Sequence, residues 1–144
     1  MSYTADVVEG LAELLAEQGL GTYGPPDEPY PTTGTAIVLG VMPAQPDRVL
    51  CLTPYPITDT GGPEAITAVQ VRMRAGRDPR AVYDLADDVF GVLDGREHYR
   101  LREVSVSLSW RQSEASLGLD GSNRMELTAN YYFRTLRRTA HTHE

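Results

Sequence analysis

The sequence contains no lysine, only one cysteine and no long apolar run. The single cysteine, Cys51, excludes a disulfide framework and a thiol metal cluster, and its apolar surroundings "RVLCLT" favour a buried, unreactive thiol. No segment approaches the roughly 20 apolar residues that cross a bilayer, and the N-terminus carries acids where a signal peptide carries basic residues. We therefore expect a soluble cytoplasmic protein with no membrane partner.

The charge balance bears on the choice of partner. The chain has 20 acidic residues against 13 arginines, a formal net charge of −7. Nucleic-acid binding depends on neutralising phosphates with basic side chains, so this balance argues against DNA or RNA as a tightly held partner.

Residues suited to catalysis or metal binding are scarce. The histidines are His98, His141 and His143, and the last two lie in a C-terminal "HTHE" that lacks the preorganisation of a metal site. Asp87 and Asp88 point in different directions on a predicted helix, which is typical of a solvated surface rather than of acid–base catalysis. "TDTGGPE" has no lysine after its glycines and does not match a phosphate-binding loop. The sequence predicts no enzyme activity, no metal and no cofactor.

Two segments have the periodicity of amphipathic helices. Residues 4–18 place their valine and leucines on one side and their glutamates on the other. Residues 79–94 do the same, with Asp78 as a good N-cap, Pro79 as a favoured first residue and Gly95 just past the end. Both segments need a sheet to cover their apolar sides.

The remaining apolar segments have the pattern of β-strands separated by irregular stretches. The predicted strands are 36–42, 48–53, 66–74, 99–111 and 123–138. The predicted loops are the Pro- and Gly-rich segments 22–35 and 54–65 and a connection at 112–122. The fold class is α+β: a mostly antiparallel sheet of about five strands with two amphipathic helices packed on one face, in the order α-β-β-β-α-β-β. One domain spans residues 1–144.

The segment "VSVSLSW" at 104–110 predicts a strand with one apolar and one small, uncharged face. Val104, Val106, Leu108 and Trp110 should face the core, and Ser105, Ser107 and Ser109 the open side of the sheet. The same open face should carry Gln70, Arg72, Arg74, Glu126, Thr128, Asn130, Tyr132 and Arg134. A solvated face is the simplest interpretation. However, three serines in one strand leave room for another backbone layer, which favours packing against a partner.

Two stretches of the chain resemble a known family. "AVQVRMRAGRDPRAVYDLADDVFGVLDG" (68–95) is similar to a strand–helix unit of tailed-bacteriophage minor capsid proteins that act as tail terminators. "GLDGSNRMELTANYYFRTLRR" (118–138) resembles the final strand of that family, with its loop at Asp120–Arg124 and the strand core at Thr128–Tyr131.

The resemblance implies a structural virion protein without catalytic residues. Such a protein forms a hexameric ring on the tail tube, stops tube polymerisation and presents a surface to the connector and neck proteins of the head. It is located in the tail or neck of the virion after assembly in the bacterial cytoplasm, and DNA passes through its channel without tight binding. We expect the following residues at the interface with neighbouring copies or with the major tail tube protein: Arg72, Arg74, Ser105, Ser107, Ser109, Leu117, Leu119, Asp120, Arg124, Glu126, Asn130, Tyr132 and Arg134.

The arginines of this set need partners if the sheet approaches a channel for DNA. We expect them to pair with acids of the same or of neighbouring copies. Two other interpretations stay open: a head-closure or neck protein of the same virion, and a small α+β domain that binds a small molecule or acts as an enzyme.

Overall fold

The computed structural model describes residues 2–24, 29 and 33–140. The fold is α+β, as predicted, with two helices and a mostly antiparallel sheet that has six strands rather than five. In chain order the elements are α1 (Tyr3–Glu17), β1 (Thr35–Leu39), β2 (Arg48–Asp59), β3 (Glu64–Ala75), α2 (Pro79–Leu93), β4 (Arg96–Leu101), β5 (Val104–Leu119) and β6 (Met125–Leu136).

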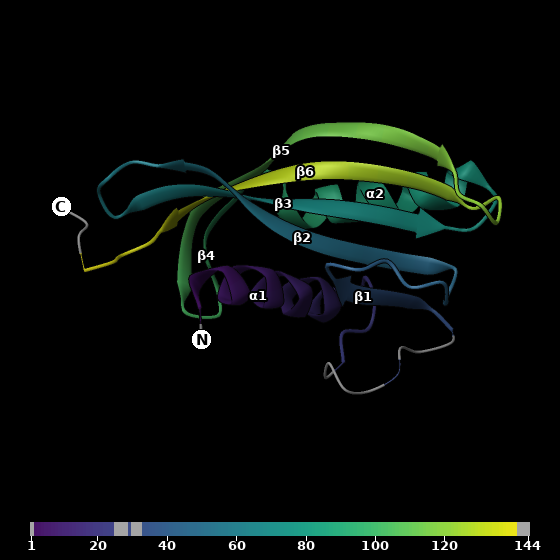
Figure 1. Ribbon diagram of the computed structural model, residues 1–144, viewed down its shortest axis with the longest axis horizontal. Coiled ribbons are helices and arrows are strands. Elements are labelled where there is room, and N and C mark those ends of the chain that lie inside the picture. Colours follow the sequence, from purple (N-terminus) through teal and green to yellow (C-terminus); the bar gives the residue numbers. More distant parts are fainter. Residues whose placement is uncertain (1, 25–28, 30–32, 141–144) are drawn as a thin grey trace.

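The strands form one long, twisted sheet in the order β1-β2-β3-β6-β5-β4 (Figure 1). β1 runs parallel to β2, and every other pair is antiparallel. The β2–β3 hairpin ends near the C-terminal end of the described chain, whereas the β5–β6 turn lies at the opposite end of the molecule. The sheet therefore presents two different ends to its surroundings.

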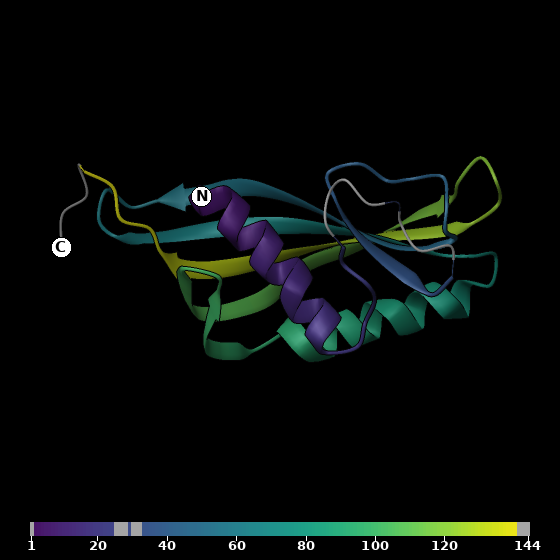
Figure 2. The ribbon, with the colours of Figure 1, turned by 90° about the horizontal axis from the view of Figure 1, so that it is seen from below.

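Both helices cover the same face of the sheet (Figure 2), as the apolar periodicity predicts. In α2 the carboxylate of Asp78 accepts a hydrogen bond from the backbone N–H of Arg80 at 3.0 Å, and Pro79 occupies the first turn. Gly95 follows the helix at φ 75°, a conformation that residues with a Cβ rarely adopt. The apolar side of α2 is fully enclosed: Val82, Leu85, Ala86, Val89 and Leu93. Neither helix is long and apolar enough to cross a membrane, within the described residues.

Two segments predicted as loops are strands. Residues 54–59 extend β2 despite Pro54 and Pro56, and residues 112–119 extend β5, so that only Asp120–Arg124 connects β5 to β6. The predicted strand 99–111 is instead divided by a tight turn, where Arg102 has φ 52°. Composition alone predicted loops here because proline and glycine are depleted from strands, but they are tolerated on edges and at bulges.

The two long sheet edges differ in chemistry. Beyond Leu52, β2 has no described strand on its outer side, and Pro54 and Pro56 remove backbone donors from that edge. Beyond Ser109, β5 likewise has no described strand on its outer side, because the pairing of β4 ends there. That part of β5 contains no proline. The prolines thus prevent strand pairing along the outer side of β2, whereas the outer side of β5 can still pair with another strand.

Some predictions fall on residues outside the described part of the chain. The irregular stretch 22–35 is described only at 22–24, 29 and 33–35, and the "HTHE" of residues 141–144 lies outside it altogether. Cys51 is described and is a free, buried thiol, and burial raises its pKa above the usual value.

Candidate interface on the open face of the sheet

A β-bulge reverses the faces of the "VSVSLSW" strand halfway along. Val106 pairs with Thr135 of β6 and Leu108 pairs with Arg134, so two residues of β5 oppose one of β6. Ser109 then lies opposite the buried Phe133 and is itself fully buried. The prediction that Ser109 lies on the open face is therefore wrong, as is the prediction that Leu108 and Trp110 face the core. Strict alternation in sequence gives no sign of a bulge, because the extra residue leaves the pattern of residue types unchanged.

The buried Ser109 has a structural role. Its hydroxyl donates to the carbonyl of Leu93 at 2.7 Å and accepts from the hydroxyl of Tyr99 at 2.6 Å. These bonds join the end of α2 to β4 and β5. Burial raises the pKa of Tyr99 to about 12.

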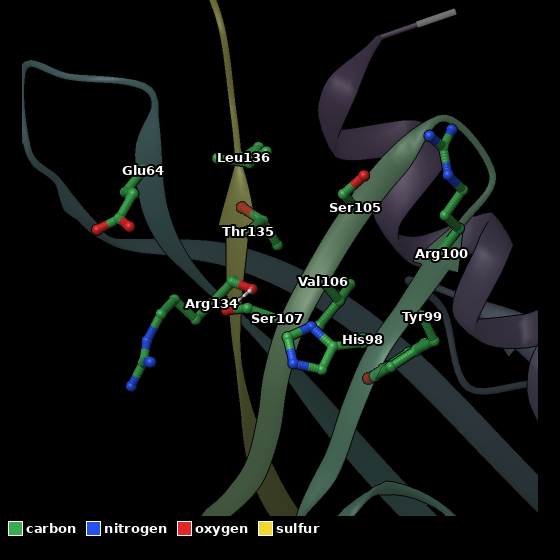
Figure 3. Close-up of a pocket in the computed structure, with 10 residues that line it drawn as sticks. All are labelled: Glu64, His98, Tyr99, Arg100, Ser105, Val106, Ser107, Arg134, Thr135 and Leu136. Carbon is green, nitrogen blue, oxygen red and sulfur yellow. Dashed lines mark hydrogen bonds between the residues drawn. The ribbon is translucent and has the colours of Figure 1, made fainter. Parts of the chain in front are cut away.

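Ser105 and Ser107 do lie on the open face, where they form the floor of a hollow of about 410 Å³ (Figure 3). Across the sheet, Ser105 pairs with Arg100 of β4, and the side chains of β6 next to the two serines belong to Arg134 and Leu136. The hollow exists because two small side chains lie between longer ones on both neighbouring strands. This answers why the strand carries serines rather than the long charged residues of an ordinary solvated face.

Aromatic and amide side chains occupy the middle of the open face. The rings of Trp110 and Tyr132 meet edge to face, with centroids 5.8 Å apart, and the guanidinium of Arg134 lies 5.9 Å from the Trp110 ring centroid. Asn130 accepts a hydrogen bond from the hydroxyl of Tyr55 at 2.7 Å and donates to Ser113 at 3.0 Å. Asn130, Tyr132 and Arg134 are therefore on the face where the sequence predicts them.

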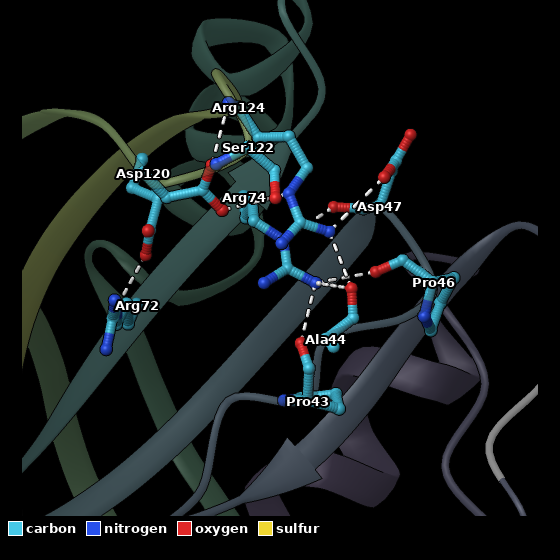
Figure 4. Close-up of polar contacts among 10 residues, drawn as sticks. Pro43, Ala44, Pro46, Asp47, Arg72, Arg74, Asp120, Ser122 and Arg124 are labelled. Carbon is cyan, nitrogen blue, oxygen red and sulfur yellow. Dashed lines mark hydrogen bonds and ion pairs between the residues drawn. The ribbon is translucent and has the colours of Figure 1, made fainter.

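An arginine cluster lies beyond this region, near the β5–β6 turn (Figure 4). Arg72 donates to the carboxylate of Glu126 at 2.5 Å, and the Glu126 side chain is only 5% exposed. This hydrogen bond raises the pKa of Arg72 above its usual value. The pair links β3 to β6 and neutralises a buried carboxylate.

Arg74 is the most buried member of the cluster, at 2% exposure. Its guanidinium donates to the backbone carbonyls of Pro43, Ala44, Pro46 and Asp47, at distances from 2.7 to 3.4 Å. No carboxylate forms an ion pair with it in the described part of the chain, and burial lowers its pKa below the usual value. Arg74 thus fastens the segment between β1 and β2 onto the open face.

Arg124 fastens the β5–β6 turn to the same segment. Its Nε donates to Asp120 at 2.9 Å, and its Nη1 donates to the Ala44 carbonyl at 2.6 Å and lies 3.3 Å from the Asp47 carboxylate. Asp120 also accepts from the backbone N–H groups of Ser122 and Arg124, and these bonds hold its pKa below the usual value. These bonds therefore hold the turn against the segment between β1 and β2.

The expectation that the arginines pair with acids holds for Arg72 and Arg124, which pair within the chain. It is wrong for Arg74, which is satisfied by carbonyl groups. Arg134 is exposed and forms no ion pair within the described residues, and its guanidinium lies against the ring of Trp110.

Leu117 and Leu119 lie next to the braced turn and are 50% and 58% exposed. The β5–β6 pairing has two further register shifts, between Arg111 and Ser113 and between Ser116 and Gly118, and the last of them makes Leu117 the extra residue of a bulge. Two large apolar side chains are therefore exposed next to the turn that Arg124 holds.

The described residues include no metal-binding cluster. Within residues 2–24, 29 and 33–140, no group of three or more histidine, cysteine, aspartate or glutamate side chains is arranged to hold a metal ion. The polar groups of the open face bind one another and fix backbone segments of the same chain.

The fold resembles that of one chain in a solved structure of a gene transfer agent particle. One chain of a structure titled "Virion of native gene transfer agent (GTA) particle" superposes with a TM-score of 0.54 at 12% sequence identity, covering 69% of this chain and 78% of that one. At this identity the likeness concerns the fold alone. No curated protein matches the chain.

The family assignment comes from the sequence itself. The profile of a family described as "Bacteriophage tail terminator protein" matches residues 14–137. The chain belongs to this family and is a structural component of the phage tail, as the resemblance predicted.

Proposed function

We propose that copies of this protein form a closed ring, hexameric as the resemblance implies, on the last ring of the tail tube. The ring stops tube polymerisation and offers its other side to the neck of the head. The family match over residues 14–137 supports the role, and one observation points to the surface involved. Exposed Leu117 and Leu119 adjoin a turn that Arg124 ties to the body of the sheet.

The β5–β6 end of the subunit has features that suit contact with the last ring of the tail tube. The turn is already ordered in the free subunit, so less conformational entropy is lost on docking. Two exposed leucines supply apolar area, and burying each contributes about 1.5–3 kcal/mol. We therefore assign the β5–β6 end to the tube or to the adjacent subunit at the tube.

A phage lacking the gene, complemented with variants, tests the proposal. Leu117→Asp with Leu119→Asp should give overlong or variable tails without heads in electron micrographs. Ile57→Asp is the matched control, because Ile57 is also an exposed apolar residue, at 37%, but belongs to the opposite hairpin. This control should give normal virions.

Two outcomes contradict the proposal. Tails of normal length beside unfilled or leaky heads indicate a neck protein. Normal virions from the deletion strain remove any role in tail assembly.

A further inference from the structure

The hollow over Ser105 and Ser107 carries positive charge that the subunit does not neutralise. Arg100 and Arg134 lie on its rim and are exposed, and neither forms an ion pair with an acid among the described residues. One acid, Glu64, also borders the hollow. In a chain with a net charge of −7, two unpaired cations beside an apolar wall indicate a partner that brings an apolar group flanked by acids.

The outer side of α2 offers that combination. Tyr83 is 48% exposed and is a large aromatic residue on the solvent-facing side of α2, away from the buried apolar side of that helix. Asp84 is its neighbour and Asp87 lies one turn further on, at the i, i+4 position, where side chains meet on a helix surface. Both aspartates are exposed and unpaired in the described part of the chain. Tyr83 thus has exposed carboxylates on its C-terminal side, while Arg80, one turn before it, is paired with Asp78. An exposed aromatic residue beside carboxylates has the form of an interface anchor with a polar rim.

The two surfaces cannot meet within one subunit. The hollow lies on the open face of the sheet (Figure 3), and α2 covers the other face (Figure 2), so the sheet lies between them. Contacts between two different surfaces of identical chains are head-to-tail, and they generate a ring when the rotation closes.

We propose that Tyr83 of one copy occupies the hollow of the neighbouring copy in the ring, with Asp84 and Asp87 pairing with Arg134 and Arg100. The inference rests on the proposed ring and names the contact that closes it. A hollow of about 410 Å³ falls within the usual size range of ligand pockets, about 300–1,000 Å³, and accommodates one phenol ring. Because the floor of the hollow carries small serine side chains, the phenol ring of Tyr83 can approach the backbone of β5.

Site-specific cross-linking tests the contact. The double variant Tyr83→Cys with Ser107→Cys is assembled on tube ends and treated with a short bifunctional maleimide, and the buried Cys51 should contribute no background. The expected result on denaturing gels is a ladder of oligomers. Each single variant alone should remain monomeric, and a mixture of the two single variants should stop at dimers. Dimers from Tyr83→Cys alone indicate a symmetric contact and overturn the proposal.

Charge exchange supplies an independent test. Arg134→Asp should reduce cross-linking at least tenfold, and Asp84→Arg in the same chain should restore it, while circular dichroism confirms that both variants fold. Failure of the double variant to recover cross-linking contradicts the pairing.

The outcomes separate this inference from the proposed function. Normal tail length without any ladder overturns the Tyr83 contact and leaves the terminator role intact. A deletion strain with normal tails overturns both.

Discussion

Gly10 of α1 lies directly against the backbone of Leu101 at the end of β4. A Cβ added to Gly10 would come within 2.7 Å of the Cα and carbonyl carbon of Leu101, closer than real contacts allow. The helix and the strand therefore approach each other as closely as they do because this position has no side chain. Arg102 lies in the turn that follows β4 and links this turn to α1. Its guanidinium forms ion pairs with Glu9 and Glu13 at 3.0 and 2.9 Å.

Gly10→Ala should lower the free energy of unfolding despite its better helix propensity. Alanine favours a helix by about 0.5–1 kcal/mol over glycine, but overpacking against rigid backbone costs about 1–3 kcal/mol, so we expect a net loss of about 1–2 kcal/mol. Urea unfolding followed by circular dichroism measures the difference. Gly91→Ala in α2 is the control, because nothing lies within 4 Å of its added Cβ, and it should be neutral or stabilising. A stable Gly10→Ala variant contradicts the packing described.

Arg74→Met should destabilise the subunit by about 2–4 kcal/mol, because hydrogen bonds to a charged group are worth more than neutral ones and the freed carbonyls lose their donor. Arg74→Lys should not restore stability, since an ammonium cannot reproduce the planar fork that reaches four carbonyls. Thermal unfolding of the variants tests both statements. Arg80→Met, on an exposed arginine that pairs only with Asp78, should leave the midpoint unchanged.

The free energy of unfolding should depend on pH in the alkaline range because of Tyr99. Its pKa is raised to about 12, so above pH 10 the unfolded chain releases the phenol proton while the folded chain retains it. The folded state then binds more protons than the unfolded state, and stability falls as pH rises from about 10 to about 12. Tyr99→Phe should lose stability less steeply over this interval in urea titrations at successive pH values. Parallel curves for the two proteins contradict the assignment.

Trp110 is the single tryptophan and lies half-buried on the open face, so its fluorescence reports on that face directly. If neighbouring copies cover the face in the ring, the emission of Trp110 should shift to the blue and acrylamide quenching should fall on assembly. The free subunit at the same concentration is the reference. Unchanged quenching in terminated tails means that the open face faces solvent.

Periodicity predicted most elements because it reflects burial on one side of a helix or strand. Val82, Leu85 and Val89 meet the sheet as their spacing requires, and Val71 and Met73 face the core while Arg72 and Arg74 do not. The order of the elements followed from these patterns and from capping residues such as Asp78.

Prediction failed where a contact between distant residues decides the structure. The bulge at Val106 and Leu108 lies where β5 pairs with both β4 and β6, and neither pairing strand is visible from the local sequence. Residues 112–119 are extended because residues 125–130 provide a pairing strand, despite the small and polar residues there. The carbonyl partners of Arg74 could not be predicted either, since they come from backbone atoms that tertiary folding brings together.

Pro54 and Pro56 of β2 make the two long edges of the sheet unequal in their capacity to pair with another strand. A ribbon of copies that join edge to edge needs two open strand edges on every copy, and Pro54 and Pro56 remove one of them. Copies therefore cannot pair along this stretch of β2, however concentrated the protein becomes. Copies that assemble must then use other contacts, and the geometry of those contacts fixes how many copies the assembly contains.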